Sequence, residues 1–227
     1  MKRSEINRLM REAKAFFKLN NFHLPPWAER TPGDWQGTYS TNSEIVDNML
    51  GWDLTDFGSG DFMKRGLLLF TLRNGNPAKD KKPYAEKIMI VREEQETPMH
   101  FHFSKMEDII VRGGGRLAME LWGSTPDGQL AHGDVQLRVD GILRSFKAGS
   151  TLAIGPGESV CFTQGLYHRF WGEKGAGTVL VGEVSMVNDD TEDNRFLEPL
   201  GRFPAIEEDE EPLHLLASDY HARVRKG

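Results

Sequence analysis

Several features that are common in other protein classes are scarce or absent in this chain. It has one cysteine, Cys161, among 227 residues, so no disulfide can form within it. No apolar run approaches the roughly 20 residues that a membrane-spanning helix needs. The first residues, MKRSEINRL, lack the apolar core of a signal peptide. These absences predict a protein that works in the reducing cytoplasm and does not insert into a membrane.

Positive charge is also in deficit. The chain carries 28 Lys and Arg residues against 34 Asp and Glu residues, a net charge of -6. Because phosphate binding requires a basic face, this balance argues against a nucleic-acid partner. The apolar content of 38% and the five tryptophans are sufficient for a core, and the mean hydropathy of -0.50 predicts a water-soluble domain.

The apolar pattern divides the chain into three parts. Residues 4–19 follow the 3.6-residue period of an amphipathic helix, and the rest of 1–66 reads as irregular apart from a short helix over 43–50. Short alternating segments separated by turn residues fill 67–185, which predicts a barrel or double-sheet jelly roll. Residues 186–227 are again irregular and contain an acidic run typical of a solvated surface. We therefore expect a single domain over 1–227, with an all-β core, an N-terminal helix and irregular extensions at both ends.

The most informative pattern is His100-x-His102-x4-Glu107-x6-Gly114. Side chains at positions i and i+2 of a strand point the same way, so His100 and His102 face one side together. Glu107 follows after a short step that can return it to the same pocket. The spacing predicts that these three side chains bind a metal ion.

His168 follows a Gly-Pro-Gly turn and an apolar strand, and it is the predicted fourth ligand. The other histidines that could take this place are His132, His214 and His221, none of which lies in a comparable strand. The full set predicts a site of three histidines and one glutamate inside a β-barrel.

These motifs resemble the cupin superfamily. Its first motif, G-x5-H-x-H-x3-4-E-x6-G, is matched from His100 to Gly114, with Glu94 in place of the opening glycine. The second motif is matched by Pro156-Gly157 and His168, at a longer interval. The resemblance implies a cupin jelly-roll β-barrel.

The flanking segments are more specific. Residues 98–116, 182–196 and 201–212, together with the N-terminal helix and NNFHLPPWA after it, resemble the D-lyxose isomerase family of cupin sugar isomerases. The likeness covers nearly the whole chain. It implies a divalent metal, most often Mn2+, and interconversion of D-lyxose with D-xylulose. The family often also interconverts D-mannose and D-fructose.

The ligand set suits this aldose–ketose isomerisation. Four protein ligands leave two positions of an octahedral shell open, which the C1 and C2 oxygens of a sugar can fill. The metal then stabilises an enediolate while an acid and a base move the proton. Mixed nitrogen and oxygen ligation suits manganese, iron, cobalt or nickel alike.

Four further residues are candidates for the reaction. Lys105 lies between two metal ligands, so it could hydrogen-bond a sugar oxygen or shuttle a proton. Glu183, an acid among apolar strand residues, is the candidate general base. Asp190 and Arg195 could bind sugar hydroxyls from a loop over the barrel mouth.

Two other functions use the same ligands. A cupin with this site can be a non-haem iron dioxygenase, or a sugar-binding protein without catalysis. The polar, acidic loop near the site favours a sugar over an aromatic substrate. Because barrels tend to cover exposed strand edges by pairing, we also expect a homodimer.

Overall fold

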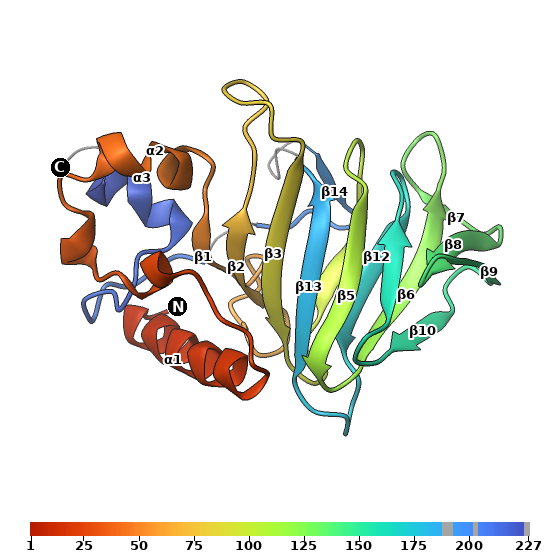
Figure 1. Cartoon of the computed structure of the whole chain (residues 1–227). Coiled ribbons are helices and arrows are strands. Elements are labelled where there is room, and N and C mark those ends of the chain that lie inside the picture. The colour runs from red at the N-terminus through yellow and green to blue at the C-terminus, as the bar shows by residue number, and fades with distance from the viewer. Residues whose placement is uncertain (188–192, 202–203, 225–227) are drawn as a thin grey trace.

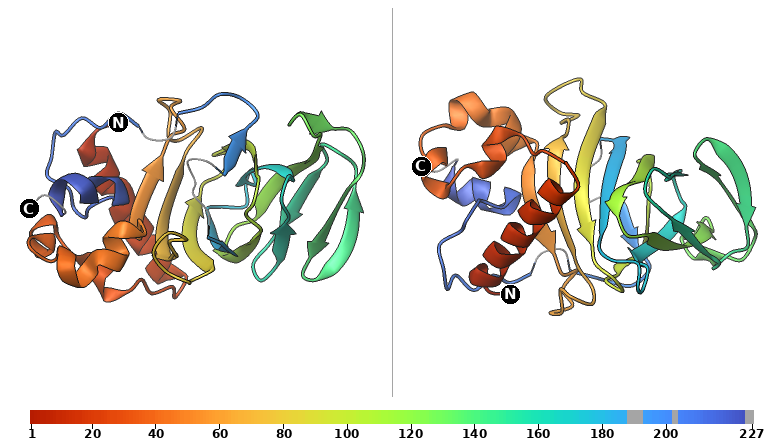
Figure 2. Two further views of the ribbon diagram at one scale, coloured as in Figure 1. Left: turned by 90° about the horizontal axis from the view of Figure 1, so that it is seen from above. Right: turned by 60° about the horizontal axis from the view of Figure 1, so that its bottom comes forward.

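The computed structural model describes residues 1–187, 193–201 and 204–224. Within these residues the strands form two antiparallel sheets that curl into an open barrel (Figures 1 and 2). The larger sheet has eight strands, in the spatial order β1 (Gly51–Thr55), β2 (Leu67–Arg73), β3 (Tyr84–Val91), β13 (Val179–Met186), β5 (Glu107–Gly114), β11 (Ser159–Phe162), β8 (Val135–Val139) and β9 (Ile142–Phe146).

The second sheet lies across the barrel from the first. Its order is β10 (Thr151–Ile154), β6 (Leu117–Ser124), β12 (Tyr167–Gly172), β4 (Thr97–His102) and β14 (Asn194–Phe196), and β7 (Leu130–Ala131) pairs with β6. The predicted all-β jelly-roll core is therefore confirmed.

The helices gather with the N-terminus at one end of the molecule (Figure 1). They are α1 (Arg3–Leu19), α2 (Tyr39–Asp47) and α3 (Tyr220–Arg223), with short 3-10 turns at Pro26–Glu29, Pro32–Trp35 and Ala217–Asp219. The apolar face of α1 packs on the outer face of the large sheet, where it covers Trp52, Leu54, Phe70 and Leu180. None of the helices within the described residues is both long and apolar enough to cross a bilayer.

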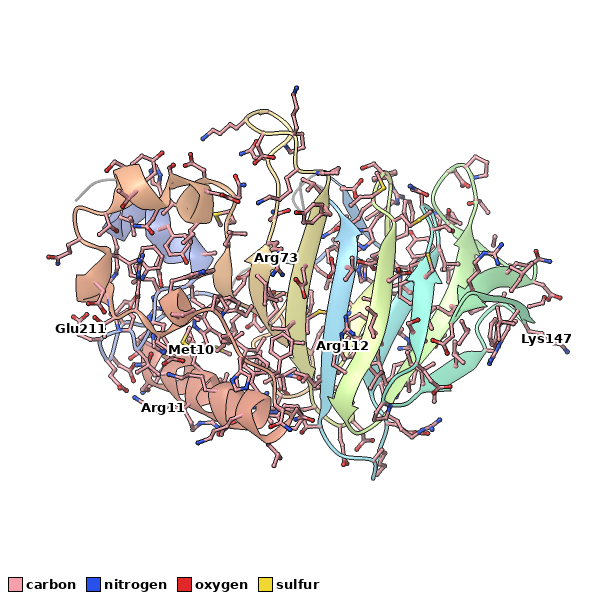
Figure 3. All side chains as sticks on the ribbon, viewed as in Figure 1. Met10, Arg11, Arg73, Arg112, Lys147 and Glu211 are labelled. Atoms are coloured by element: carbon pink, nitrogen blue, oxygen red, sulfur yellow. The ribbon has the colours of Figure 1, made fainter. Side chains whose placement is uncertain are left out.

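The acidic run near the C-terminus holds α1 in place. Arg3 is fully buried and pairs with Glu208 at 2.7 Å and with Asp219 at 3.0 Å. Asp209 accepts hydrogen bonds from the backbone N–H and the hydroxyl of Ser4, in the first turn of α1. Figure 3 shows Arg11 and Glu211 at this helical end of the molecule and Lys147 at the opposite end.

The extensions contain more regular structure than the sequence predicts. The short helix begins at Tyr39 and ends at Asp47, and Gly51 opens strand β1 instead of ending a helix. Strand β14 forms within the C-terminal part and pairs with β4. Both strands are short, and each exists because a longer neighbour supplies its hydrogen bonds.

The interior of the barrel differs between its two ends. On β13 the inward positions run from Val179 and Val181 to Glu183 and Ser185, and on β5 Val111 and Glu107 lie opposite Val181 and Ser185. One end of these strands is thus lined by apolar side chains and the other by ionisable ones. The candidate site lies at the ionisable end.

Candidate metal centre and active site

Three histidines converge inside the barrel. Strand β4 supplies His100 and His102, and β12 supplies His168, which lies directly opposite His100 in the register. One ring nitrogen from each lies within 4.8 Å of the other two, and all three side chains are buried. The three predicted histidines therefore form one group that could hold a metal ion.

The hydrogen bonds of two of these rings fix their protonation. His100 Nδ1 lies 2.7 Å from the Pro98 carbonyl, and His168 Nδ1 lies 3.0 Å from the Leu166 carbonyl. A carbonyl only accepts, so Nδ1 carries the proton and Nε2 keeps its lone pair. Burial lowers the pKa of both His100 and His168, which favours the neutral rings that bind metals.

The donor set fits a divalent metal. In the part of the chain that the structure describes, Nε2 of His168 and Nδ1 of His102 are buried without a hydrogen-bond partner. An unpaired buried nitrogen is costly, and ligation to a metal would satisfy it. Neutral imidazoles beside a carboxylate suit a transition metal such as manganese or iron.

Glu107, at the start of β5, lies against this group. Its Oε1 accepts a hydrogen bond from His102 Nε2 at 3.3 Å and lies 3.2 Å from His168 Nε2, while Oε2 lies 2.7 Å from Lys105 Nζ. Burial raises the pKa of Glu107, but the Lys105 ammonium and the hydrogen bond with His102 outweigh it and hold the pKa well below its usual range. Glu107 is therefore a carboxylate, as a metal ligand must be.

Glu183 is the centre of a second polar group. Its Oε1 accepts from Ser185 Oγ at 2.9 Å, from Lys87 Nζ at 3.1 Å and from Lys105 Nζ at 3.2 Å. Lys87 faces Glu183 across the β3–β13 register. Lys105 is 3% exposed and bridges the carboxylates of Glu107 and Glu183. Lys105 and Glu183, the predicted acid–base pair, are therefore linked to the histidine group by direct contacts through Glu107.

The loop that carries Lys105 is held by Asp193, the residue directly before β14. Asp193 accepts hydrogen bonds from the backbone N–H and the hydroxyl of Ser104 and from the N–H of Lys105. Burial raises the pKa of Asp193, and the bonds from Ser104 outweigh it, so the net shift is downward. The sequence analysis missed this residue because its partners lie about ninety positions earlier in the chain.

His100, His102, Lys105, Glu107 and Glu183 line one cavity of about 390 Å3. This size is suitable for one small polar ligand. Much of the remaining lining is apolar: Phe57, Leu67, Leu69, Met89, Ile109, Phe170, Phe196 and Leu200. The Phe196 ring packs on His100 with 5.3 Å between ring centroids. Asp53 and Lys87, which the sequence analysis did not select, also line the cavity.

Of the two predicted sugar-binding residues, only Arg195 lies among the residues that the structure describes. Asp190 lies outside the described residues. Arg195 is exposed on β14 and lines a separate groove near Gly128, whereas its neighbours Asn194 and Phe196 line the cavity. Strand alternation explains this, because adjacent residues point to opposite faces.

The other histidines are used elsewhere. His214 packs parallel to the Trp52 ring and its Nδ1 lies 2.9 Å from the Arg30 carbonyl, while His132 packs against the edge of Trp122. Among the described residues, the metal-competent group contains His168 and not these two.

A buried three-histidine group inside a jelly-roll barrel defines a cupin-type metal site. The chain belongs to the D-lyxose isomerase family, whose model matches residues 1–220. It is 51% identical over 223 residues to a D-lyxose/D-mannose isomerase of Serratia proteamaculans and 50% identical over 224 residues to one of Escherichia coli O157:H7. Each match covers 97% of this chain and 98% of the relative. The predicted family is confirmed, and the chain is a sugar isomerase.

Solved structures support the same fold. The L-ribose isomerase of Cellulomonas parahominis matches with a TM-score of 0.62 at 15% identity, and that of Geodermatophilus obscurus with 0.55 at 16%. In both cases the match covers 91% of this chain and 98% of the other. At such low identity the likeness concerns the fold alone, which is the predicted cupin barrel.

Proposed function

We propose that this protein interconverts D-lyxose with D-xylulose and D-mannose with D-fructose. The names of its two relatives support the sugars, because both align over nearly the whole chain. The observation that carries the proposal is the series of contacts from the histidine group through Glu107 and Lys105 to Glu183 along one cavity. An isomerase needs a binding site for two adjacent oxygens beside a base. The histidine group with Glu107 would provide the first, and Glu183 the second.

His100, His102, His168 and Glu107 would hold a divalent metal, for which we propose Mn2+. When bound, this metal would supply Lewis-acid polarisation of the sugar oxygens at C1 and C2. Glu107 is already ionised, and the rings of His100 and His168 are already neutral, so these ligands are prepared for the metal.

Glu183 would act as the general base. In the aldose-to-ketose direction it would take the proton from C2 and return it to C1, while a second proton passes from the C2 oxygen to the C1 oxygen. Two ammonium groups within 3.2 Å balance the charge of this carboxylate. Lys105 would donate to a sugar oxygen and orient it, since its Nζ lies between Glu183 and the ligand Glu107.

We retain Asp190 and Arg195 as predicted sugar-binding residues. For Arg195, this role requires its guanidinium to leave the groove at Gly128.

We also propose a homodimer in the cytoplasm. Strand β9 ends the large sheet and exposes Ile142 and Leu143, an apolar edge that a second copy would cover. Light scattering of the purified protein tests the dimer.

The function is tested by an anaerobic assay of metal-stripped protein, to which Mn2+ and then D-lyxose or D-mannose are added. Ketose that forms only with metal, and without oxygen, is the expected result. Protein that holds its metal and yields ketose from neither sugar would contradict the proposal. Oxygen consumption by that protein would then favour the dioxygenase.

A further inference from the structure

Asp53 on β1 lines the same cavity as the histidine group, yet the proposed chemistry does not use it. We propose that Asp53 binds the sugar hydroxyls farthest from the metal centre and sets how well six-carbon sugars are converted relative to five-carbon sugars. This inference rests on the proposed isomerase function and adds a specificity-determining residue to it.

The strand order places Asp53 at the far side of the cavity. From the metal centre outward the strands run β5, β13, β3, β2 and β1, which carry Glu107, Glu183, Lys87, Leu69 and Asp53. Asp53 therefore enters the cavity from the edge strand, on the side away from the metal centre.

The alternation of β1 directs this side chain. Trp52 and Leu54 pack in the apolar cluster beneath α1, so Asp53 and Thr55 face the other side, into the cavity. The Asp53 Oδ1 atom accepts the backbone N–H of Leu54 at 2.8 Å, which orients the carboxylate. A carboxylate offers about four acceptor positions, so it can accept hydroxyl protons of a sugar in addition.

The surroundings of Asp53 favour a polar ligand there. On this side of the cavity β1 contributes Asp53 and Thr55, which pair in register with the apolar Leu69 and Leu67 of β2. The far end of the cavity therefore combines an apolar surface for sugar C–H groups with the polar side chains of Asp53 and Thr55.

The two proposed sugars differ only at this end. D-Lyxose and D-mannose share their configuration at C2, C3 and C4, and D-mannose has one further CH(OH) carbon. Contacts near the metal cannot distinguish them, so discrimination must come from the far hydroxyls. Loss of one hydrogen bond to a charged group typically weakens binding by about 10- to 100-fold.

The experiment compares kcat/KM for both sugars in the Mn2+-loaded full chain. In Asp53→Asn, which keeps the size and the acceptor for Leu54, the kcat/KM for D-mannose should fall about 10- to 100-fold more than that for D-lyxose, mainly through KM. Lys87→Met removes a contact of Glu183 and should lower kcat/KM for both sugars alike. Asp134→Asn changes an exposed carboxylate before β8 and should leave both values unchanged.

An unchanged mannose-to-lyxose ratio in folded Asp53→Asn would overturn the inference. If this variant does not fold, Asp53→Glu is measured instead. It keeps the charge and lengthens the side chain, and it should reduce kcat/KM for D-mannose more than kcat/KM for D-lyxose. An unchanged ratio in that variant would also overturn it. Failure of the wild-type protein to isomerise either sugar would instead overturn the proposed function.

Discussion

Strands β5 and β13 carry apolar inward side chains at one end and ionisable ones at the other. At one end Val111, Val179 and Val181 are completely buried in an apolar core. At the other end Glu107 and Glu183 occupy equivalent inward positions and are almost as deeply buried. The first end stabilises the barrel by the burial of apolar surface. The second must compensate each buried charge with a partner, and so provides chemistry at the expense of stability.

The largest predicted effect comes from the ligands at the polar end. His102→Ala or Glu107→Ala should abolish both metal retention and ketose formation. The first removes a member of the metal-competent histidine group, and the second removes the proposed carboxylate ligand beside it. Metal content by mass spectrometry and the ketose assay measure this. His132→Ala, a matched control at an exposed histidine after β7, should retain both. A ligand variant that stays active without metal would refute the site.

Lys105→Ala should separate metal binding from turnover. It leaves all four proposed ligands in place but removes the cation between Glu107 and Glu183. Turnover should fall by about 10^2- to 10^4-fold, the usual contribution of a proton-transfer group, while the metal stays bound. Steady-state kinetics with metal analysis tests this. Lys147→Ala, at the end of the molecule away from the helices (Figure 3), is the control. Equal rates in both variants would exclude a role for Lys105.

Leu117→Ala tests the apolar end. Leu117 is completely buried on β6 and faces the closed core, so its truncation should lower the free energy of unfolding by about 2–5 kcal/mol. Activity per folded molecule should not change. Urea unfolding measures the free energy of unfolding, and steady-state kinetics measures the activity per folded molecule. Leu143→Ala, which is 55% exposed, should cost less than about 0.5 kcal/mol. A loss of activity without a loss of stability would contradict this division.

The smallest effect concerns pH and the attachment of α1. The hydrogen bond from Arg3 lowers the pKa of Glu208 below 4.5, and the N–H of Ser4 lowers that of Asp209 below 3.8. Groups with a depressed pKa in the folded state stabilise it above their ordinary pKa and lose this as the pH falls through the lowered value. The protection of α1 amides against hydrogen exchange, relative to the intrinsic rate at each pH, should therefore be high at pH 7 and fall below about pH 4.5.

Glu208→Gln should weaken that pH dependence. It removes a titrating group beside Arg3 and keeps a polar side chain of similar size. Protection of α1 amides that is the same at pH 7 and below pH 4.5 in the wild-type protein would show that these carboxylates do not hold the helix.

The sequence predicted the parts of the site that depend on local spacing. His100 and His102 share a face because strands alternate, and the barrel followed from many short strands with turns. Strand β1 was missed because Trp52 and Leu54 provide only two apolar positions, and its pairing with β2 is not visible in so short a segment. Asp53 was missed with it. The partners of the acidic run lie about 200 residues away, so its role in holding α1 could not be inferred from spacing.

The central claim is that the ionisable end of the barrel performs acid–base chemistry through Glu183. The most direct test is the single-turnover rate of D-lyxose conversion by Mn2+-loaded Glu183→Gln beside the wild-type protein. The account predicts a rate about 10^2- to 10^4-fold lower, with metal content and sugar affinity unchanged. A variant that holds its metal and converts D-lyxose at the wild-type rate would contradict it.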